Sequence, residues 1–245
     1  MLLVDIGKRK FRNECCKIPQ FVKDETANNL LTDLNKYSHA YLLACLMDRQ
    51  IKAERAWMIP HHVSKEIGSF EIEILKNVSQ KEMTKIFSNN KLHRFNDTMS
   101  KVFYEGIKDI VHKYAGDASA IWKNKPSSSS VVYKFLEFKG SGIKISTMAA
   151  NILARQFKIP FSDYYSIDIS PDVHIIRVMK RMGLVPQKAN NDMIIYKARE
   201  LNPEFPGIID SSCWEIGRTW CRPNCPDCNA CIVNKECAKN IGRQV

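Results

Sequence analysis

The C-terminal stretch of the chain carries cysteines at spacings that suit a metal centre. Cys221, Cys228, Cys231 and Cys237 follow the pattern Cys-x6-Cys-x2-Cys-x5-Cys and lie within 17 residues. Four thiolates so close in sequence can surround one compact metal site, and soft sulfur ligands select zinc or iron–sulfur clusters. Zinc ribbons usually pair two Cys-x2-Cys knuckles, whereas here a single Cys-x2-Cys has longer arms on both sides. The spacing therefore favours a [4Fe–4S] cluster.

Alternatives for these cysteines stay open. Cys225, Cys228 and Cys231 also form a ferredoxin-like Cys-x2-Cys-x2-Cys run, so Cys225 could replace Cys221 as the outer ligand. Zinc is a second alternative. A disulfide framework is the third, and it is disfavoured because no signal peptide is recognised at the start of the sequence. The other cysteines are expected to be ordinary buried thiols: Cys15, Cys16, Cys45 and Cys213.

Two motifs earlier in the chain contain residues able to break bonds. Gly140 and Gly142, one residue apart between two helical segments, permit a tight hairpin whose amides can hold a phosphate, and Lys144 follows. Asp172 follows Pro171 at the predicted start of a helix, where free amides surround its carboxylate. A lysine amine can act as a nucleophile, and a carboxylate can stabilise developing positive charge. Taken singly, each motif is also compatible with an ordinary helix turn or helix cap.

The charge of the chain indicates a polyanionic partner. Lys and Arg number 37 against 26 Asp and Glu, which gives a formal net charge of +11. Such a balance favours nucleic acid over a membrane surface, although a merely basic soluble protein has the same composition. No apolar run reaches the roughly 18 residues of a membrane span. We expect an intracellular protein, located in the cytoplasm beside the nucleoid if the source is prokaryotic.

Helical periodicity predominates from Thr26 onward, and alternating strand patterns are nearly absent, so the predicted fold is all-α. Residues 1–25 show no clean period, and the segment Lys123–Ser130 is expected to be a loop. Ser38 and Ser79 are predicted N-caps, and Pro60 is expected at a helix break. The other predicted helical segments are 28–35, 39–48, 53–59, 70–78, one from Ser79, 96–114, 117–122, 131–138, 144–157, 171–182, 189–202 and 207–220.

In chain order the motifs resemble the endonuclease III branch of the helix-hairpin-helix DNA glycosylases. The matching patterns are Gly140-x-Gly142-x-Lys144, then Asp172-x-His174-x-x-Arg177-Val178, then the cysteine loop after Ile216-Gly217-Arg218. The resemblance covers about residues 38–240. It implies two helical domains with a DNA-binding cleft between them. Residues 38–165 would contain the hairpin, and residues 1–37 plus 166–245 would contain the cluster loop.

The resemblance also implies an activity, which is excision of a damaged base from double-stranded DNA. Lys144 would attack C1′ of an extruded nucleotide and nick the strand through a Schiff base, with Asp172 as its charged partner. An abasic site would be a second substrate, and the protein would act as a monomer. Oxidised pyrimidines are the favoured substrate, with mismatched bases and oxidised guanine as alternatives. The residues expected to contact DNA are Gly140, Gly142, Gln50, Arg49 and Arg218.

Several features depart from the family pattern. Lys139 and Ser141 stand where the family usually has proline and valine, and Lys144 and Asp172 are 28 positions apart, which is longer than is typical. Asp168 is a rival for the acidic role, although the register of His174 favours Asp172. The proposed chemistry needs an uncharged lysine, which a dry pocket around it would favour.

Two other classes of protein fit part of this pattern. A non-catalytic DNA-binding iron–sulfur protein could keep the hairpin and the cluster loop, although retention of both Lys144 and Asp172 argues against it. A ferredoxin-like electron carrier could use the run from Cys225 to Cys231. A net charge of +11 and a long helical body fit an electron carrier poorly.

Overall fold

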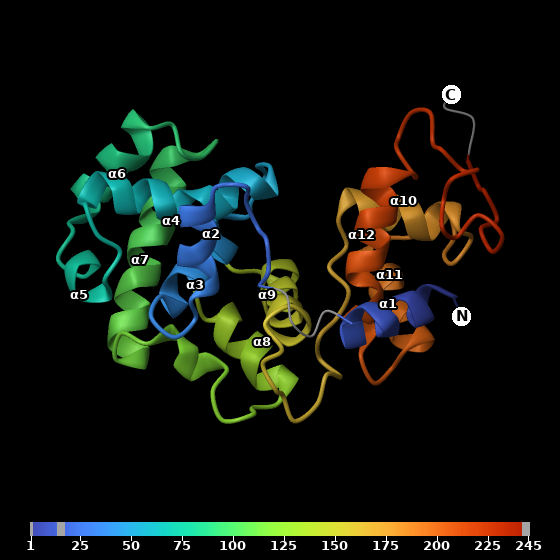
Figure 1. The fold of residues 1–245 in the computed structure, drawn as a ribbon, viewed down its shortest axis with the longest axis horizontal. Coiled ribbons are helices and arrows are strands. Elements are labelled where there is room, and N and C mark those ends of the chain that lie inside the picture. Colours follow the sequence, from blue (N-terminus) through green and yellow to red (C-terminus); the bar gives the residue numbers. More distant parts are fainter. Residues whose placement is uncertain (1, 14–17, 242–245) are drawn as a thin grey trace. The chain divides into compact units, whose positions relative to one another are not determined.

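The protein is all-helical in the computed structural model, which describes residues 2–13 and 18–241 (Figure 1). No strand occurs in these residues, so the predicted all-α class is confirmed. None of the described helices has both the length and the apolar character needed to cross a bilayer. The elements are α1 (Leu2–Asn13), α2 (Glu25–Thr32), α3 (Ser38–Met47), α4 (Ala53–Ile67), α5 (Ile72–Leu75), α6 (Gln80–Asn89), α7 (Asn96–Tyr114), η1 (Ala118–Ile121), α8 (Ser128–Leu136), α9 (Ile143–Arg155), α10 (Val173–Arg181), α11 (Asn191–Leu201), η2 (Pro206–Ile209) and α12 (Asp210–Thr219).

The chain forms two compact units. The hairpin unit comprises Ile18–Pro126 and Tyr133–Ala149, and the C-terminal unit comprises Met1–Lys17, Ser127–Val132 and Ala150–Val245. These limits do not coincide with the expected boundaries, since residues 18–37 fall in the hairpin unit and residues 150–165 in the C-terminal unit. The division into domains at residues 38 and 165 stays a prediction.

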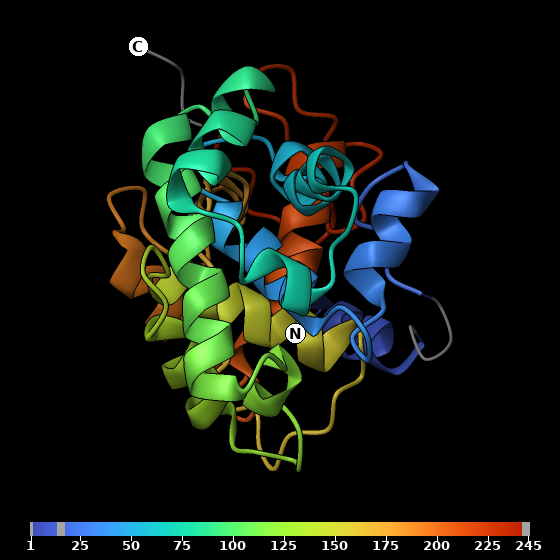
Figure 2. The same ribbon diagram turned by 90° about the vertical axis from the view of Figure 1, so that its left-hand side faces the viewer.

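The hairpin unit is built around α3, every residue of which is buried. Helices α2, α4 and α7 and the short helix η1 pack against it. Figure 2 shows α7 along the face of this unit that is turned to the viewer, with α6 at its upper end. Inside the core, the Tyr41 hydroxyl donates a 2.8 Å hydrogen bond to the Ala149 carbonyl and so ties α3 to α9. A helix buried on all sides needs such internal partners for its polar groups.

The C-terminal unit has α10 and α12 packed against each other, with α1 covering α12 and η2. Gly217 lies where these two helices approach closely, because a Cβ atom there would be 2.7 Å from the Cβ atom of His174. A side chain at position 217 would push α12 away from α10. This contact fixes the position of α12 relative to the helix that follows Asp172.

Three predicted features of the hairpin unit differ from the structure. Pro60 lies inside α4 rather than at a break, with its ring buried among core residues. The helix predicted over residues 70–78 is reduced to the single turn α5. Ser38 is the first residue of α3 and donates to Asp117 instead of capping the helix. Ser79 does cap α6, since its hydroxyl accepts the Glu82 amide at 3.2 Å.

Two further differences concern segments expected to lack structure. Residues 2–13 form α1, which buries Leu3, Val4 and Ile6 on one face and exposes Lys8 and Arg9 on the other. Helix α8 begins at Ser128, inside the serine-rich stretch expected to be a loop. In both cases tertiary packing outweighs weak local signals.

The two hairpin glycines should differ in their effect on stability. Gly140 has φ +86°, and a Cβ atom there would be 3.0 Å from Val102, whereas a Cβ atom on Gly142 would have no other atom within 4 Å. We expect Gly140→Ala to lower the free energy of unfolding by about 1–2 kcal/mol. The control Gly142→Ala should change it by less than about 0.5 kcal/mol. Chemical denaturation measures both, and equal losses would contradict this geometry.

Candidate functional site

The hairpin between α8 and α9 is anchored at both ends. Phe138 is buried and its ring stacks on Tyr114, with the centroids 6.0 Å apart. The Ser141 amide donates to the Phe138 carbonyl at 3.0 Å, and the Ser146 amide donates to the Gly142 carbonyl at 3.0 Å. The turn is therefore closed by backbone hydrogen bonds immediately before the first turn of α9.

The two unusual hairpin residues have polar partners. Lys139 forms an ion pair with Glu105 on α7, with 2.9 Å between nitrogen and oxygen. The hydroxyls of Ser141 and Ser146 lie 2.9 Å apart, within hydrogen-bonding distance. This hairpin thus holds polar side chains where the family pattern has proline and valine. Polar contacts replace apolar packing there.

Lys144 is the second residue of α9 and its side chain is exposed. An exposed amine is accessible to a substrate, as a nucleophile must be. A dry pocket around this lysine stays a prediction.

The segment before α10 is held at several successive residues by the rest of the C-terminal unit. The Gly207 amide donates to the Ile167 carbonyl at 2.7 Å. Arg199 donates to both carboxylate oxygens of Asp168, each at 2.8 Å. The Ser170 amide donates to Asp210 at 2.7 Å. These contacts fix the backbone that leads to Asp172.

Asp172 occupies the N-cap of α10. One oxygen of its carboxylate, Oδ1, accepts both the His174 and the Ile175 amides at 2.8 Å. The rival acid Asp168 is only 5% exposed, and both of its oxygens accept from Arg199. Asp168 thus has a structural ion pair, whereas Asp172 uses a single oxygen in the two cap hydrogen bonds. The arrangement favours Asp172 for the acidic role.

Asp210 is a further acid in this region that sequence reasoning did not single out. Burial raises the pKa of its carboxyl to about 6, against the lowering effects of the Ser170 hydrogen bond and the Arg155 charge. The charge of Asp172 adds to the upward shift. The sequence signal was weak, since Asp210 follows an apolar run and reads as a helix-start residue.

Four of the five cysteines in the C-terminal loop line one cavity. They are Cys221, Cys228, Cys231 and Cys237, and apolar side chains such as Val178 and Ile216 complete its walls. Cys225 is absent from this lining, is exposed, and has φ +51°. The cavity therefore contains the cysteine set with the Cys-x6-Cys-x2-Cys-x5-Cys spacing.

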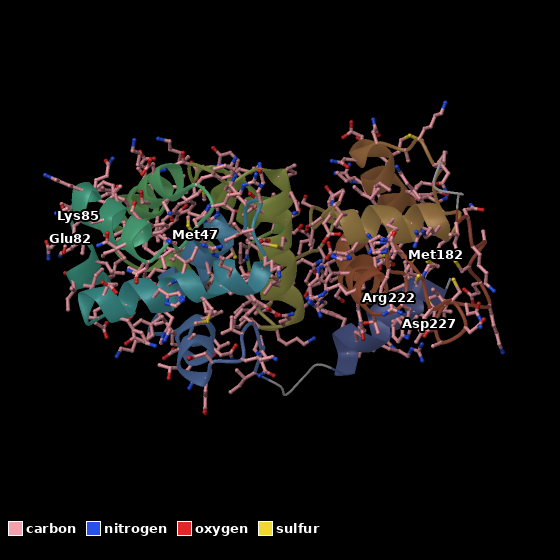
Figure 3. The ribbon with its side chains drawn as sticks, turned by 90° about the horizontal axis from the view of Figure 1, so that it is seen from above. Met47, Glu82, Lys85, Met182, Arg222 and Asp227 are labelled. Atoms are coloured by element: carbon pink, nitrogen blue, oxygen red, sulfur yellow. The ribbon has the colours of Figure 1, made fainter. Side chains whose placement is uncertain are left out.

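Two arginines of α10 hold the start of the cysteine loop. Arg177 donates to the Cys221 carbonyl at 2.7 Å and to the Gly217 carbonyl at 2.8 Å. Arg181 donates to the carbonyls of Arg222 and Pro223 at 2.7 and 2.9 Å, and its Nη1 lies 3.7 Å from the Cys221 sulfur. Figure 3 labels Arg222 and Asp227 of this loop near Met182, which follows α10.

The thiols of the loop are close enough to influence one another. Burial raises the pKa of Cys231, and the charges of the other three cavity cysteines add to the shift. All seven cysteines among the described residues are unbridged. Within those residues, no group of three or more His, Cys, Asp or Glu side chains is arranged to hold one metal ion.

The residues expected near a flipped base lie in the exposed loop between α3 and α4. Arg49 and Gln50 are both exposed, and Gln50 has φ +54°. Sequence reasoning missed the segment that packs beside them, where His93 approaches the Met47 carbonyl at 3.2 Å and the Arg94 guanidinium lies over the Phe95 ring at 5.3 Å. The run His-Arg-Phe before a long helix was the available signal.

The predicted site residues divide between the two units. The hairpin unit contains the hairpin glycines, Lys144, Arg49 and Gln50, and the C-terminal unit contains Asp172, Arg218 and the cysteines. Arg218 is exposed and its guanidinium lies 4.4 Å from the centre of the Trp214 ring. The pairing of Lys144 with Asp172 stays a prediction.

Comparison with known proteins gives a consistent picture of the fold. Neither a protein-family model nor a curated protein matches this sequence. Among solved structures, a trapped endonuclease III–DNA covalent intermediate is similar at a TM-score of 0.62 and 14% identity, covering 97% of this chain and 93% of that one. A thermostable thymine-DNA glycosylase is similar at 0.63 and 13% identity, with 97% and 94% covered.

A third similar structure is the Clostridium acetobutylicum 8-oxoguanine glycosylase/lyase in complex with DNA, at a TM-score of 0.56 and 13% identity. That match covers 87% of this chain and 69% of the other. The chain therefore has the fold of the helix-hairpin-helix base-excision glycosylases, as its motifs led us to expect. Identities this low show the fold alone.

The buried Asp210 should make stability depend on pH. Its folded pKa of about 6 lies above the ordinary value of 3.8, so proton binding favours the folded state at low pH, and this contribution disappears as the pH rises through 6. We expect the wild type to lose about 1 kcal/mol between pH 5 and 7.5 that Asp210→Asn does not lose. Chemical denaturation of both proteins measures the difference. The same pH dependence in both would contradict a buried, ionisable Asp210.

Proposed function

We propose that this protein is a DNA glycosylase with lyase activity that removes a damaged base from double-stranded DNA. The observation that carries the proposal is an exposed lysine at the start of α9, directly after a Gly-x-Gly hairpin, in a chain with the glycosylase fold. The structures similar in fold include an endonuclease III bound covalently to DNA. The net charge of +11 supports a polyanionic partner.

The first step of the proposed reaction forms a bond between Lys144 and the sugar. The uncharged amine attacks C1′ of the extruded nucleotide, the glycosidic C–N bond breaks, and the base leaves with its bonding electron pair and takes up a proton. Loss of a proton from the new C1′ amine and opening of the ring give an iminium ion. Asp172 would stabilise the positive charge that develops on the sugar.

The second step nicks the strand. Removal of a C2′ proton from the iminium ion expels the 3′ phosphate by β-elimination, and water then releases Lys144 from the sugar. The first amides of α9 and the hairpin glycines would hold a flanking phosphate without reading a base. Arg49, Gln50 and Arg218, all exposed, would contact DNA around the damaged nucleotide.

The cysteine cavity fits an iron–sulfur cluster better than zinc. A zinc ion would draw four sulfurs to about 2.3 Å from one point, whereas a four-iron cluster holds its thiolates around a larger body. Four cysteines line the cavity, and their spacing, with a single Cys-x2-Cys between longer arms, supports the cluster. A bound [4Fe–4S] cluster would supply four metal–thiolate bonds that stabilise the loop. Arg181 and the Lys239 amide, 3.4 Å from the Cys237 sulfur, would stabilise thiolate charge.

The preferred base is an oxidised pyrimidine, on the resemblance of the motifs to endonuclease III. Mismatched thymine and 8-oxoguanine are the alternatives, since glycosylases named for those bases have the same fold. A panel of duplexes, each carrying one altered base, scored for base release and strand nicking, would identify the substrate.

Replacement of Lys144 tests the proposed nucleophile. We expect wild-type protein with an abasic duplex and borohydride to form a covalent complex, and Lys144→Ala to form none and to lose roughly a thousandfold or more in nicking rate. Lys85→Ala is a matched control, because Lys85 is also an exposed lysine of the hairpin unit, on α6 (Figure 3). A trapped complex with Lys144→Ala would assign the nucleophile to another amine. No trapped complex with wild type while DNA still binds would favour a non-catalytic DNA-binding protein.

Replacement of single cysteines tests the metal site. Cys221→Ala should lose the brown absorbance and most of the bound iron, and its stability should fall, because Cys221 lines the cavity. Cys225→Ala should keep both, because Cys225 is exposed outside it. Visible spectra and elemental analysis of the two variants show which of the two cysteines is needed to hold the iron. One zinc per chain, or iron loss only in Cys225→Ala, would contradict the assignment.

A further inference from the structure

Asp210 is a half-buried acid that the proposed chemistry does not use. It is the first residue of α12, and its Oδ2 accepts the Ser170 amide at 2.7 Å. The Ser170 side chain adds a second hydrogen bond to the same carboxylate. Ser170 is itself only 4% exposed and lies two residues before Asp172. Asp210 therefore holds the backbone directly before the proposed catalytic acid.

Three kinds of group surround this carboxylate. Arg155, the last residue of α9 and only 8% exposed, provides the neighbouring positive charge. Asp172 at the start of α10 provides a negative charge. The thiol of Cys213 on α12 is influenced by the charges of both acids and by that of Lys10 on α1. Asp210 on α12 therefore interacts electrostatically with a charged residue of α9 and with the acid at the start of α10.

We propose that Asp210 is a positioning residue for Asp172: it fixes the backbone of Ile167–Asp172 through Ser170, and its charge increases the negative potential at the Asp172 carboxylate. The inference rests on the proposed function, because Asp172 matters only if positive charge develops on a sugar beside it. A second buried negative charge would strengthen the stabilisation of that sugar cation. Its own burial is tolerated because Arg155 and Ser170 partly offset the desolvation.

The charge of Asp210 should depend on pH within the working range. Its pKa of about 6 means that near pH 5 the carboxyl is mostly protonated, and that it gives its proton to water as the pH rises. The stabilisation of the cation should then increase between pH 5 and 7. Wild-type single-turnover rates of base release or Schiff-base formation should therefore rise over the same pH range.

The variant Asp210→Asn separates the effect of the Asp210 charge from the effect of its hydrogen bond to the Ser170 amide. The asparagine Oδ1 can still accept the Ser170 amide, whereas the negative charge is lost. We expect rates near those of wild type at pH 5, and roughly tenfold lower rates above pH 7, measured by borohydride trapping on an abasic duplex. Asp168→Asn is the control: it removes another acid, which is 5% exposed, lies within Ile167–Asp172 and is paired with Arg199, and it should cost stability without changing the shape of the pH profile.

A double-mutant cycle gives a readout that does not depend on activity. At pH 7.5, Asp210→Asn should raise the denaturation midpoint in the wild type and raise it less in an Asp172→Asn background, because the repulsion between the two charges is then already absent. Equal shifts in the two backgrounds, or parallel pH profiles for wild type and Asp210→Asn, would overturn the proposal. A positive cycle together with no trapped complex at any pH would refute the glycosylase function and leave the coupling of the two acids standing.

Discussion

The contacts that hold Ile167–Asp172 are the constraint on which the C-terminal unit depends. This segment has no helix of its own, so its backbone groups must find partners elsewhere. Gly207 from η2 donates to the Ile167 carbonyl, Asp210 from α12 accepts the Ser170 amide, and Arg199 from α11 holds the Asp168 side chain. Three elements distant in sequence thereby converge on the N-terminus of α10. They position the backbone before Asp172, while the Gly217–His174 contact positions α10 against α12.

Two positions of the hairpin hold polar side chains where the family pattern has apolar residues. The hairpin relies on Lys139–Glu105 and on the Ser141–Ser146 hydroxyl pair instead of a buried proline and valine. The Lys139–Glu105 pair is exposed and contributes little net stability, whereas the hydroxyl pair, in which Ser146 is buried, would be costly to leave half-made. The hairpin can therefore keep its shape with a different chemistry. This explains how the fold is retained at about 13–14% identity to the similar structures.

The sequence predicted the helical class well because most helices have a clear apolar period, as in α10 and α12. It failed where burial overrides local preference. Pro60 sits within α4, and α1 has too short an apolar face to stand out. In the C-terminal loop, the cysteine spacing identified the candidate ligands in advance. The structure adds that Cys221 lines the cavity and that Cys225 does not. Asp210 could not be recognised from sequence, because burial, which only the folded chain creates, raises its pKa, and its hydrogen-bond and charge partners Ser170 and Arg155 are 40 and 55 positions away.

Helix α10 joins two features that were described separately. Asp172 caps its N-terminus, and Arg177 and Arg181 attach its other end to the cysteine loop. The helix has nine residues, so about 13 Å of rigid rod separates the carboxylate from the loop. If the loop holds the proposed cluster, loss of the cluster would loosen the arginine contacts, and α10 would transmit that disorder to the acid. The proposed activity would then depend on the iron supply of the cell, although the proposed bond-breaking steps use only side chains of the protein.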